Sequence, residues 1–361
     1  SRGTAFWRCF THWIGGMGVL VFIMAVMPLS DSSSMHLMRA ESPGPAVGKL
    51  VPKVKTTAMI LYGIYVVFTV IEIIALLIAG MPLFDSMTLT FGTVGTGGFG
   101  LLNSSIASYS TAVQIIITVF MIICSINFTV YYMFLIKRPK EALMCEEMRY
   151  YLLIVFGSAL LIAFNIRASF ASFGKAFQQA IFQVASVIST TGFATADFNL
   201  WPEFSRMILV LLMFVGACAG STGGGFKVSR LIIMVKSVRN EIMSVTHPRS
   251  VQKVHMDGRR IPDNVVKTVL CYLAGYVVIL IVSVLLISLD NFDMTTNFTA
   301  VMATFNNVGP GLNRVGPTGN FGGFSVLSKL VLMFDMLVGR LELYPMLVIF
   351  APGLWRIHPH R

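Results

Sequence analysis

Long and short apolar stretches alternate along this chain in a fixed order. A membrane-length span at about 56–80 precedes a short apolar segment at 83–94, a glycine motif, and a second span at about 109–136. Crossing a bilayer takes about 20 apolar residues in a helix, so the short segment predicts a half-length helix. The pattern therefore predicts a unit made of a span, a half-helix, a glycine loop and a second span.

The same unit recurs twice along the chain. The recurrences lie at about 149–166, 174–189, Gly192 and 204–235, and then at about 266–289, 295–306, Gly309 and 324–350. An isolated span at 6–29 looks like the last piece of a further, first repeat. We expect the last span of an incomplete first repeat at 1–29, a second repeat at 56–136, a third at 149–235, a fourth at 266–350, and a cytoplasmic loop at 236–265.

This order predicts the fold class. We expect an all-α membrane protein in which repeated span, pore half-helix, filter loop and span units surround a pseudo-four-fold pore, with the first unit incomplete in this chain. Such repeats bury their polar loops at a shared axis, because none of them could satisfy its own backbone in lipid.

Composition and charge support a membrane protein. The 361 residues are 55% hydrophobic and 12% charged, with a mean hydropathy of +0.77, whereas soluble domains carry about 25% charged residues. The net charge of +11 could suggest nucleic acid, but lysine and arginine gather in loops that alternate with loops poor in both, such as 81–108. By the positive-inside rule the basic loops are cytoplasmic, and the glycine loops enter from the other side. We predict a multi-pass protein of the cell membrane, in contact with lipid and not with nucleic acid.

The three glycine motifs predict an ion filter. Irregular backbone at membrane depth is tolerated only where it is buried in protein or lines a wet cavity. Carbonyl oxygens can there replace the water of a potassium-sized ion, and glycine adopts the backbone angles that this requires. Ordinary interhelical turns are the alternative. The predicted filter residues are Thr96, Gly97, Gly98, Thr190, Thr191, Gly192, Asn307, Val308 and Gly309, with potassium bound there as substrate only.

A glycine-rich interruption of the span at 204–235 predicts a gate. Five glycines fall within residues 216–225, and each costs a helix about 1 kcal/mol relative to alanine. We expect a flexible loop at 217–226 that obstructs the pore beneath the filter and moves aside, although close helix packing through small residues is an alternative. The predicted gate residues in this loop are Gly220, Ser221, Thr222, Gly223, Gly224 and Gly225.

Charged residues inside apolar spans are the remaining candidates. Arg340 lies within the last span, where arginine is costly and usually functional. Facing the cavity it would oppose cation occupancy and belong to the gate; a structural pair with Glu342 or Asp335 is the alternative. Glu72 is either a buried hydrogen-bonding residue or a proton relay. Three acids near the expected pore mouth could concentrate cations or simply be solvated: Asp85, Asp197 and Asp293.

Nothing in the sequence predicts catalysis or a cofactor held by this chain. There is no phosphate-binding or dinucleotide-binding glycine motif, the six histidines lie at span ends or in loops, and the five cysteines are scattered without metal-site spacing. An intramembrane enzyme is therefore disfavoured. A secondary transporter of an organic solute is another alternative, which would predict inverted repeats and a larger midplane pocket.

With these residues in place, the chain resembles the Trk/Ktr/HKT superfamily of potassium transporters, and the Trk branch most closely. The resemblance covers essentially the whole length. It rests on the three filter motifs and on the stretches His12–Gly18, Arg39–Pro45, Ala219–Gly225 and Gly339–Glu342.

The resemblance implies a four-fold pseudosymmetric pore within one subunit, a homodimer, and a cytoplasmic ring of RCK-type regulatory subunits. That ring would carry the nucleotide and dock on basic loops such as 236–267. It also implies that loop 217–226 and Arg340 act together as the gate. The family's first filter segment has no counterpart in this sequence, and in related plant transporters a serine at the first filter glycine accompanies sodium transport. A sodium-permeable transporter of the same superfamily is thus the alternative to potassium uptake.

Overall fold

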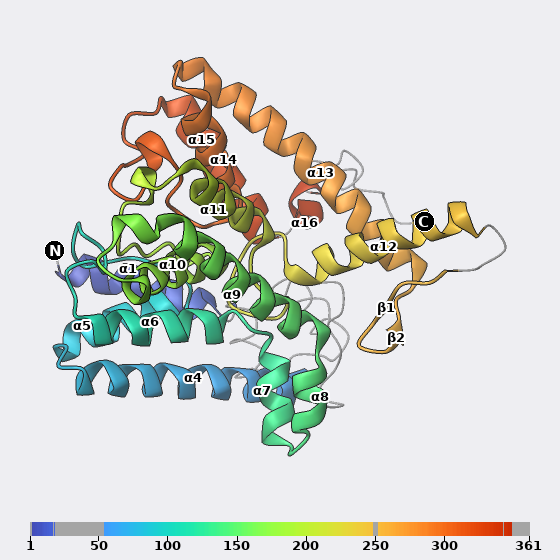
Figure 1. Ribbon diagram of the computed structural model, residues 1–361, viewed down its shortest axis with the longest axis horizontal. Helices are drawn as coiled ribbons and strands as arrows, with labels where there is room; N and C mark the ends of the chain where they lie inside the picture. The colour runs from blue at the N-terminus through green and yellow to red at the C-terminus, as the bar shows by residue number, and fades with distance from the viewer. Residues whose placement is uncertain (1, 17, 19–53, 248–251, 342, 349–361) are drawn as a thin grey trace, which may run out of the picture.

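The computed structural model describes residues 2–16, 18, 54–247, 252–341 and 343–348. These residues are mostly helical (Figure 1), as expected for an all-α protein. Strands occur among them only in one short hairpin, β1 (His255–Met256) paired antiparallel with β2 (Arg259–Arg260).

The second repeat contains the predicted short helix between longer ones. Its helices are α4 (Val54–Ile78), α5 (Leu83–Val94), α6 (Thr111–Cys124) and α7 (Phe128–Leu135), and α8 (Pro139–Met144) leads to the third repeat. The α5 helix begins directly after Pro82, whose fixed φ suits a helix start. It ends where the first glycine motif begins.

The third and fourth repeats follow the same order. The third contains α9 (Glu146–Ile166), α10 (Phe173–Ile188), α11 (Glu203–Val215) and α12 (Val228–Thr246), with short 3-10 turns at Arg167–Ser169 and Phe198–Leu200. The fourth contains α13 (Asp263–Ile287), α14 (Met294–Phe305), α15 (Val326–Arg340) and α16 (Leu343–Val348), with 3-10 turns at Ser288–Asp290 and Asn313–Val315. The half-helices expected at 174–189 and 295–306 are thus α10 and α14.

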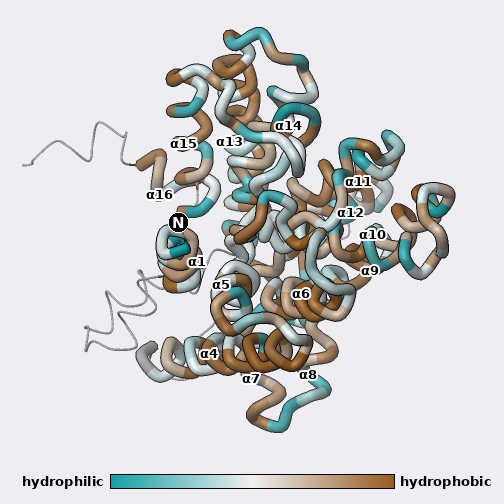
Figure 2. The backbone as a smooth tube through the Cα atoms, turned by 90° about the vertical axis from the view of Figure 1, so that its left-hand side faces the viewer, coloured by the Kyte–Doolittle hydropathy of each residue, from teal (hydrophilic) through white to brown (hydrophobic). Residues whose placement is uncertain are grey.

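The longest apolar helices form the outer wall. Spans long and apolar enough to cross a bilayer are found at Thr56–Ile78, Glu146–Ser169 and Asp263–Asp290. Less than a third of each is buried inside the protein, and Figure 2 shows apolar colour along much of α4, α6 and α7. In contrast, the carboxyl-terminal halves of α5, α10 and α14 are almost wholly buried. The half-helices therefore lie inside a wall that presents apolar side chains to lipid.

One predicted span is bent. Residues 109–136 were expected to form one helix, but α6 and α7 meet at 88°. Asn127 caps α7 by accepting a hydrogen bond from the Thr129 N–H at 2.9 Å, which offers the chain a new helix start inside an apolar run. The sequence contains no glycine or proline at this position, so the bend was not anticipated.

Two other expectations concern span ends. The predicted interruption of 204–235 is confirmed, because α11 ends at Val215 and α12 begins at Val228. Of the span expected at 6–29, α1 (Arg2–Gly16) covers the first part, and most of the remainder lies outside the described residues. The α12 helix and the β hairpin lie together on the right of the view in Figure 1, and α7 and α8 lie at its lower edge.

Candidate ion filter and intramembrane gate

The three glycine motifs share one backbone conformation. In each, two residues separated by one adopt positive φ: Thr96 (55°) and Gly98 (61°), Thr190 (59°) and Gly192 (87°), Asn307 (56°) and Gly309 (104°). Positive φ is rare outside glycine and is costly for a β-branched threonine. Its occurrence at the same two places in three loops indicates a constraint common to all three.

The hydrogen bonds of the three loops match as well. The N–H groups of Gly97 and Gly98 both donate to the Gly92 carbonyl, at 2.7 and 3.1 Å. The same pattern joins Thr191 and Gly192 to Ser186 O (3.0 and 3.2 Å), and Val308 and Gly309 to Ala303 O (2.8 and 3.4 Å). Each loop thus turns its N–H groups back toward its own half-helix. Because N–H and C=O point oppositely in a trans peptide, the carbonyl side of each loop faces away from that helix.

The loops also pack against one another. A Cβ atom added to Gly98 would overlap the Thr191 carbonyl oxygen, and one added to Gly192 would overlap the Val308 carbonyl oxygen. The first loop therefore contacts the second, and the second contacts the third. A Cβ on Gly309 would meet none of the described residues within 4 Å.

The glycine-rich segment lies against the filter loops. We call residues 216–227 the intramembrane loop. The Thr96 hydroxyl donates to the Thr222 carbonyl at 2.9 Å, and the Gly224 N–H donates to the Thr190 hydroxyl at 2.6 Å. The structure thus brings together the residues predicted for the filter and those predicted for the gate, which in these two contacts are 126 and 34 positions apart in the chain.

Arg340 reaches the same loop. Its guanidinium donates to the Thr222 carbonyl at 3.1 Å and to the Gly15 carbonyl, near the end of α1, at 3.2 Å. Of the two acids considered as alternative partners, Asp335 accepts a hydrogen bond from the Ser283 hydroxyl at 2.7 Å, and Glu342 lies outside the described residues. Arg340 therefore connects the carboxyl-terminal end of α15 to the intramembrane loop.

The intramembrane loop forms hydrogen bonds with the backbone groups at the bend between α6 and α7. The Thr222 hydroxyl and N–H both donate to the Cys124 carbonyl, at 3.1 and 3.4 Å, and the Cys218 N–H donates to the Ser125 carbonyl at 3.0 Å. In return the Phe128 N–H donates to the Gly220 carbonyl at 3.0 Å. Backbone groups freed at a break inside a membrane must find such partners, so the bend and the loop complete each other.

Two buried charged residues at the loop were not anticipated as functional. Lys227, at the end of the loop, has a positive φ of 84° and donates from its ammonium group to the Gly223 carbonyl. Glu147, in the first turn of α9, accepts from the Ala219 N–H at 2.7 Å and the Ser229 N–H at 3.1 Å. The signal that could have found them is their position, because each is an ionisable residue at the edge of an apolar segment.

The remaining acids differ in their hydrogen bonding. Glu72 is fully buried, and neither of its carboxylate oxygens has a hydrogen-bond partner among the described residues. Asp293 caps α14, and its hydrogen bonds to Thr296 lower the pKa of its carboxyl. Asp197 accepts from the Asn199 N–H at 3.0 Å, and Asp85 accepts from the Tyr109 hydroxyl at 3.3 Å. The cation-concentrating role of the last three stays a prediction.

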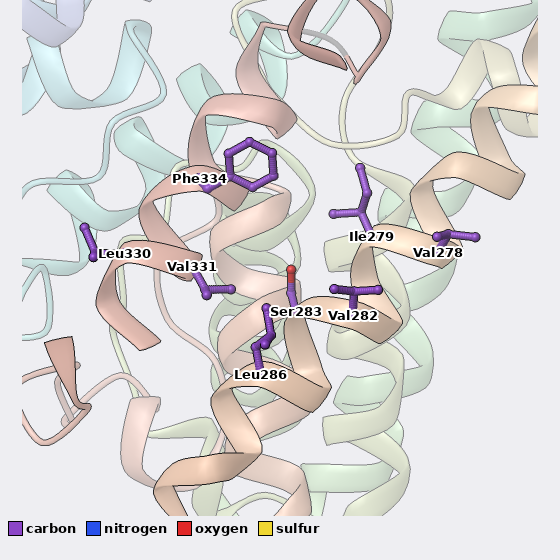
Figure 3. Close-up of a pocket in the computed structure, with 8 residues that line it drawn as sticks. All are labelled: Val278, Ile279, Val282, Ser283, Leu286, Leu330, Val331 and Phe334. Atoms are coloured by element: carbon purple, nitrogen blue, oxygen red, sulfur yellow. The ribbon is translucent and has the colours of Figure 1, made fainter. Parts of the chain in front are cut away.

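A groove of about 340 Å³ lies between α13 and α15 (Figure 3). It is lined by Val278, Ile279, Val282, Ser283, Leu286, Leu330, Val331 and Phe334. Ser283 supplies the polar side chain, and it is engaged with Asp335. Several of the others, including Val278 and Leu330, are exposed at the surface of the protein. The groove suits contact with lipid chains better than recognition of a polar solute.

Comparisons with known proteins agree with this geometry. The family model described as TrkH, cation transport protein, matches residues 1–170 and 165–357. The Trk system potassium uptake protein TrkH of Salmonella typhimurium is 35% identical over 97% of this chain and 73% of its own length. The Trk system potassium uptake protein TrkG of Escherichia coli is 30% identical over 98% of this chain and 74% of its own length.

A solved structure is similar over the same extent. The crystal structure of the potassium transporter TrkH from Vibrio parahaemolyticus matches with a TM-score of 0.84 at 32% identity. The match covers 98% of this chain and 74% of that one. The fold is thus that of a membrane transporter with apolar spanning helices. Because the family model matches nearly the whole chain, this protein belongs to the TrkH family of cation transport proteins.

Proposed function

We propose that this protein takes up potassium across the cell membrane through a filter formed by the three glycine motifs. One observation carries the proposal: the three loops share their positive φ positions and their hydrogen bonds, and they pack against one another. Carbonyls held in this way can replace the hydration shell of a dehydrated cation. The half-helices α5, α10 and α14 end at these loops, where their partial negative charge favours a cation.

Potassium is the proposed cation because the similar proteins carry that function in their names and because each filter loop keeps its glycine. Entry would follow the electrical gradient, which favours a monovalent cation by about 2.3 kcal/mol per 100 mV. A sodium-permeable transporter of the same superfamily is the alternative that the experiment below distinguishes.

The intramembrane loop and Arg340 would form the gate. The positively charged side chains of Arg340 and Lys227 donate to the carbonyls of Thr222 and Gly223. The same part of the loop bonds the filter residues, through Thr222 to Thr96 and through Gly224 to Thr190. Held there, the loop obstructs the path and the two cations oppose a potassium ion beneath the filter. Shortening residues 217–226 should raise basal flux, and a shortened loop that left flux unchanged would reduce the break to a structural kink.

We further propose that the protein works as a homodimer with a cytoplasmic ring of RCK-type subunits that carries the regulatory nucleotide. The basic segment 236–267 includes the second part of α12 and the hairpin, which lie together at one end of the molecule (Figure 1). An exposed, positively charged surface of this kind suits docking of a partner by electrostatic attraction.

The test is rubidium-86 uptake into liposomes by the full-length protein, with potassium and sodium as competitors. Competition by potassium but not by sodium would support the proposal. Equal competition would identify a sodium-permeable transporter. No uptake, even with the partner ring added, would refute the ion-pore function.

A further inference from the structure

We infer that the first turn of α9 couples the cytoplasmic hairpin to the intramembrane loop, with Glu147 as the residue that positions the loop and Glu146 as its contact with the hairpin. The inference deepens the proposed function, because its effect on transport rests on the loop being the gate. It assigns two adjacent acids that the pore itself does not use.

Glu147 bonds one residue of the intramembrane loop and one residue just after the end of the loop. It is 3% exposed, and a single carboxylate oxygen, Oε1, accepts from Ala219 N and from Ser229 N. Ser229 lies in the first turn of α12, where a negative charge also interacts favourably with the helix dipole. The two backbone donors share this one buried acceptor, and moving either donor away would leave a buried polar atom with fewer partners, so Glu147 favours the observed position of the loop.

Moving the loop away would leave this carboxylate buried without its donors. A buried acceptor that loses its hydrogen-bond donors pays the full cost of its desolvation. Release of the loop therefore requires either water at Glu147 or a displacement of Glu147 together with the loop. By the second route, the position of α9 determines whether the loop can move.

Glu146 attaches the same turn of α9 to the hairpin. Its carboxylate forms an ion pair with Lys236 of α12, and the same ammonium group donates to the His255 carbonyl at 2.7 Å. The backbone N–H of Glu146 donates to the Asp257 carboxylate, in the hairpin turn, at 2.7 Å. One residue thus contacts α12 and the hairpin, and the next residue along the chain contacts the loop.

The arrangement predicts transmission of force through adjacent residues of one rigid helix. A ligand or partner that displaced the hairpin would shift Glu146 and carry Glu147 with it, which would loosen the bonds at Ala219 and Ser229. Coupling of this kind is demonstrated only by perturbing one end and measuring the other, and the loop's own N–H groups provide the measurement.

The experiment measures amide hydrogen exchange of peptides covering residues 216–229 in the full-length protein in lipid. Lys236→Met removes the link to Glu146 and His255. Lys253→Met, which removes an equal charge from the same cytoplasmic segment and whose ammonium pairs with Asp263 at 3.0 Å, is the matched control. We expect exchange in the loop to accelerate about tenfold in Lys236→Met, equivalent to about 1.4 kcal/mol, and to stay unchanged in Lys253→Met.

A second variant tests whether Glu147 carries the effect. Glu147→Gln should itself accelerate loop exchange, and adding Lys236→Met to it should change the rate by less than about twofold, since coupled contacts are non-additive. Unchanged exchange in Lys236→Met, or an equal acceleration with and without Glu147→Gln, would overturn the inference. Lys236 is partly exposed, so its variant decides the matter even where Glu147→Gln does not fold.

Rubidium-86 flux measured on the same variants separates this inference from the proposed gate. Faster loop exchange without a change in flux would uphold the positioning role and reject the loop as the gate. If shortening the loop changes the flux but Lys236→Met leaves amide exchange in the loop unchanged, the loop remains the gate and the coupling is rejected.

Discussion

The three filter loops have the same backbone structure in every repeat, whereas the segments that follow α6, α11 and α15 differ from one repeat to the next. The three filter loops share positive φ positions and hydrogen bonds although their side chains differ, from Thr190-Thr191 to Asn307-Val308. At the ends of α6, α11 and α15, the third helix of each repeat, the chain takes three different courses: an 88° bend after Cys124, a glycine loop after Val215, and an arginine at the last turn of α15.

The difference teaches where symmetry is needed. A cation surrounded by carbonyls requires equivalent backbone from every repeat, and backbone geometry can be kept while side chains vary. Obstruction of the path requires one element only, and the other repeats then serve to hold it. Accordingly the third repeat supplies the intramembrane loop, the second supplies acceptors at Cys124 and Ser125, and the fourth supplies Arg340.

The largest effect is expected at the filter glycines. Gly98→Ala and Gly192→Ala should abolish selective uptake, because each Cβ would overlap a carbonyl of the next loop and because positive φ strains alanine by about 1–3 kcal/mol. Gly309→Ala adds the backbone strain of positive φ but no overlap with another of the described loops, so this variant should retain more uptake. Rubidium-86 uptake with sodium competition measures all three, and equal activity of all three variants would contradict the packed-loop filter.

The second prediction concerns Arg340. Arg340→Gln weakens the hydrogen bonds to Thr222 and Gly15, each worth about 1.5–3 kcal/mol for a charged donor. Basal flux should rise roughly 10- to 100-fold, while potassium selectivity is kept because the filter loops are untouched. Lys329→Gln on the same helix, whose ammonium contacts the exposed Gly322 carbonyl, is the control. Lower flux in Arg340→Gln would indicate that the arginine supports an open path instead.

The contrast between these regions also explains what the sequence could predict. The half-helices α5, α10 and α14 lie within one residue of the expected 83–94, 174–189 and 295–306, because an apolar run that stops at a glycine motif marks both ends. Interruption of the third repeat was equally visible in its five glycines.

The bend at Asn127 and the buried partners of the loop could not be predicted in the same way. The bend depends on one side-chain cap and on acceptance of hydrogen bonds by Cys124 and Ser125 from a loop about 90 residues away. Glu147 and Lys227 become meaningful only once that loop is in place. Such contacts arise from tertiary packing and leave no periodic pattern. The cap itself, an asparagine before an apolar run, was the available signal.

The third prediction tests the contacts between the two regions. Thr96→Val and Thr190→Val remove a hydroxyl that bonds the intramembrane loop while keeping the β-branched shape. Each should raise basal flux by roughly 2- to 10-fold, since a neutral hydrogen bond contributes about 0.5–1.5 kcal/mol. Thr191→Val is the control, because the Thr191 hydroxyl bonds Ser189 within the filter segment. A rise in Thr191→Val of the same size would show that the filter, and not its contact with the loop, was disturbed.

The smallest effect is expected at the bend, where two similar caps can be compared. Asn127 caps α7 next to the intramembrane loop, whereas Ser110 caps α6 at its other end. Replacing either cap by alanine should lower the free energy of unfolding by about 1 kcal/mol, measured by denaturation in detergent. Only Asn127→Ala should also raise basal flux, because the Phe128 N–H that follows it bonds Gly220 in the loop. If Ser110→Ala raised flux equally, loosening of α6 as a whole would explain the result, and the bend would lose its separate role in holding the loop.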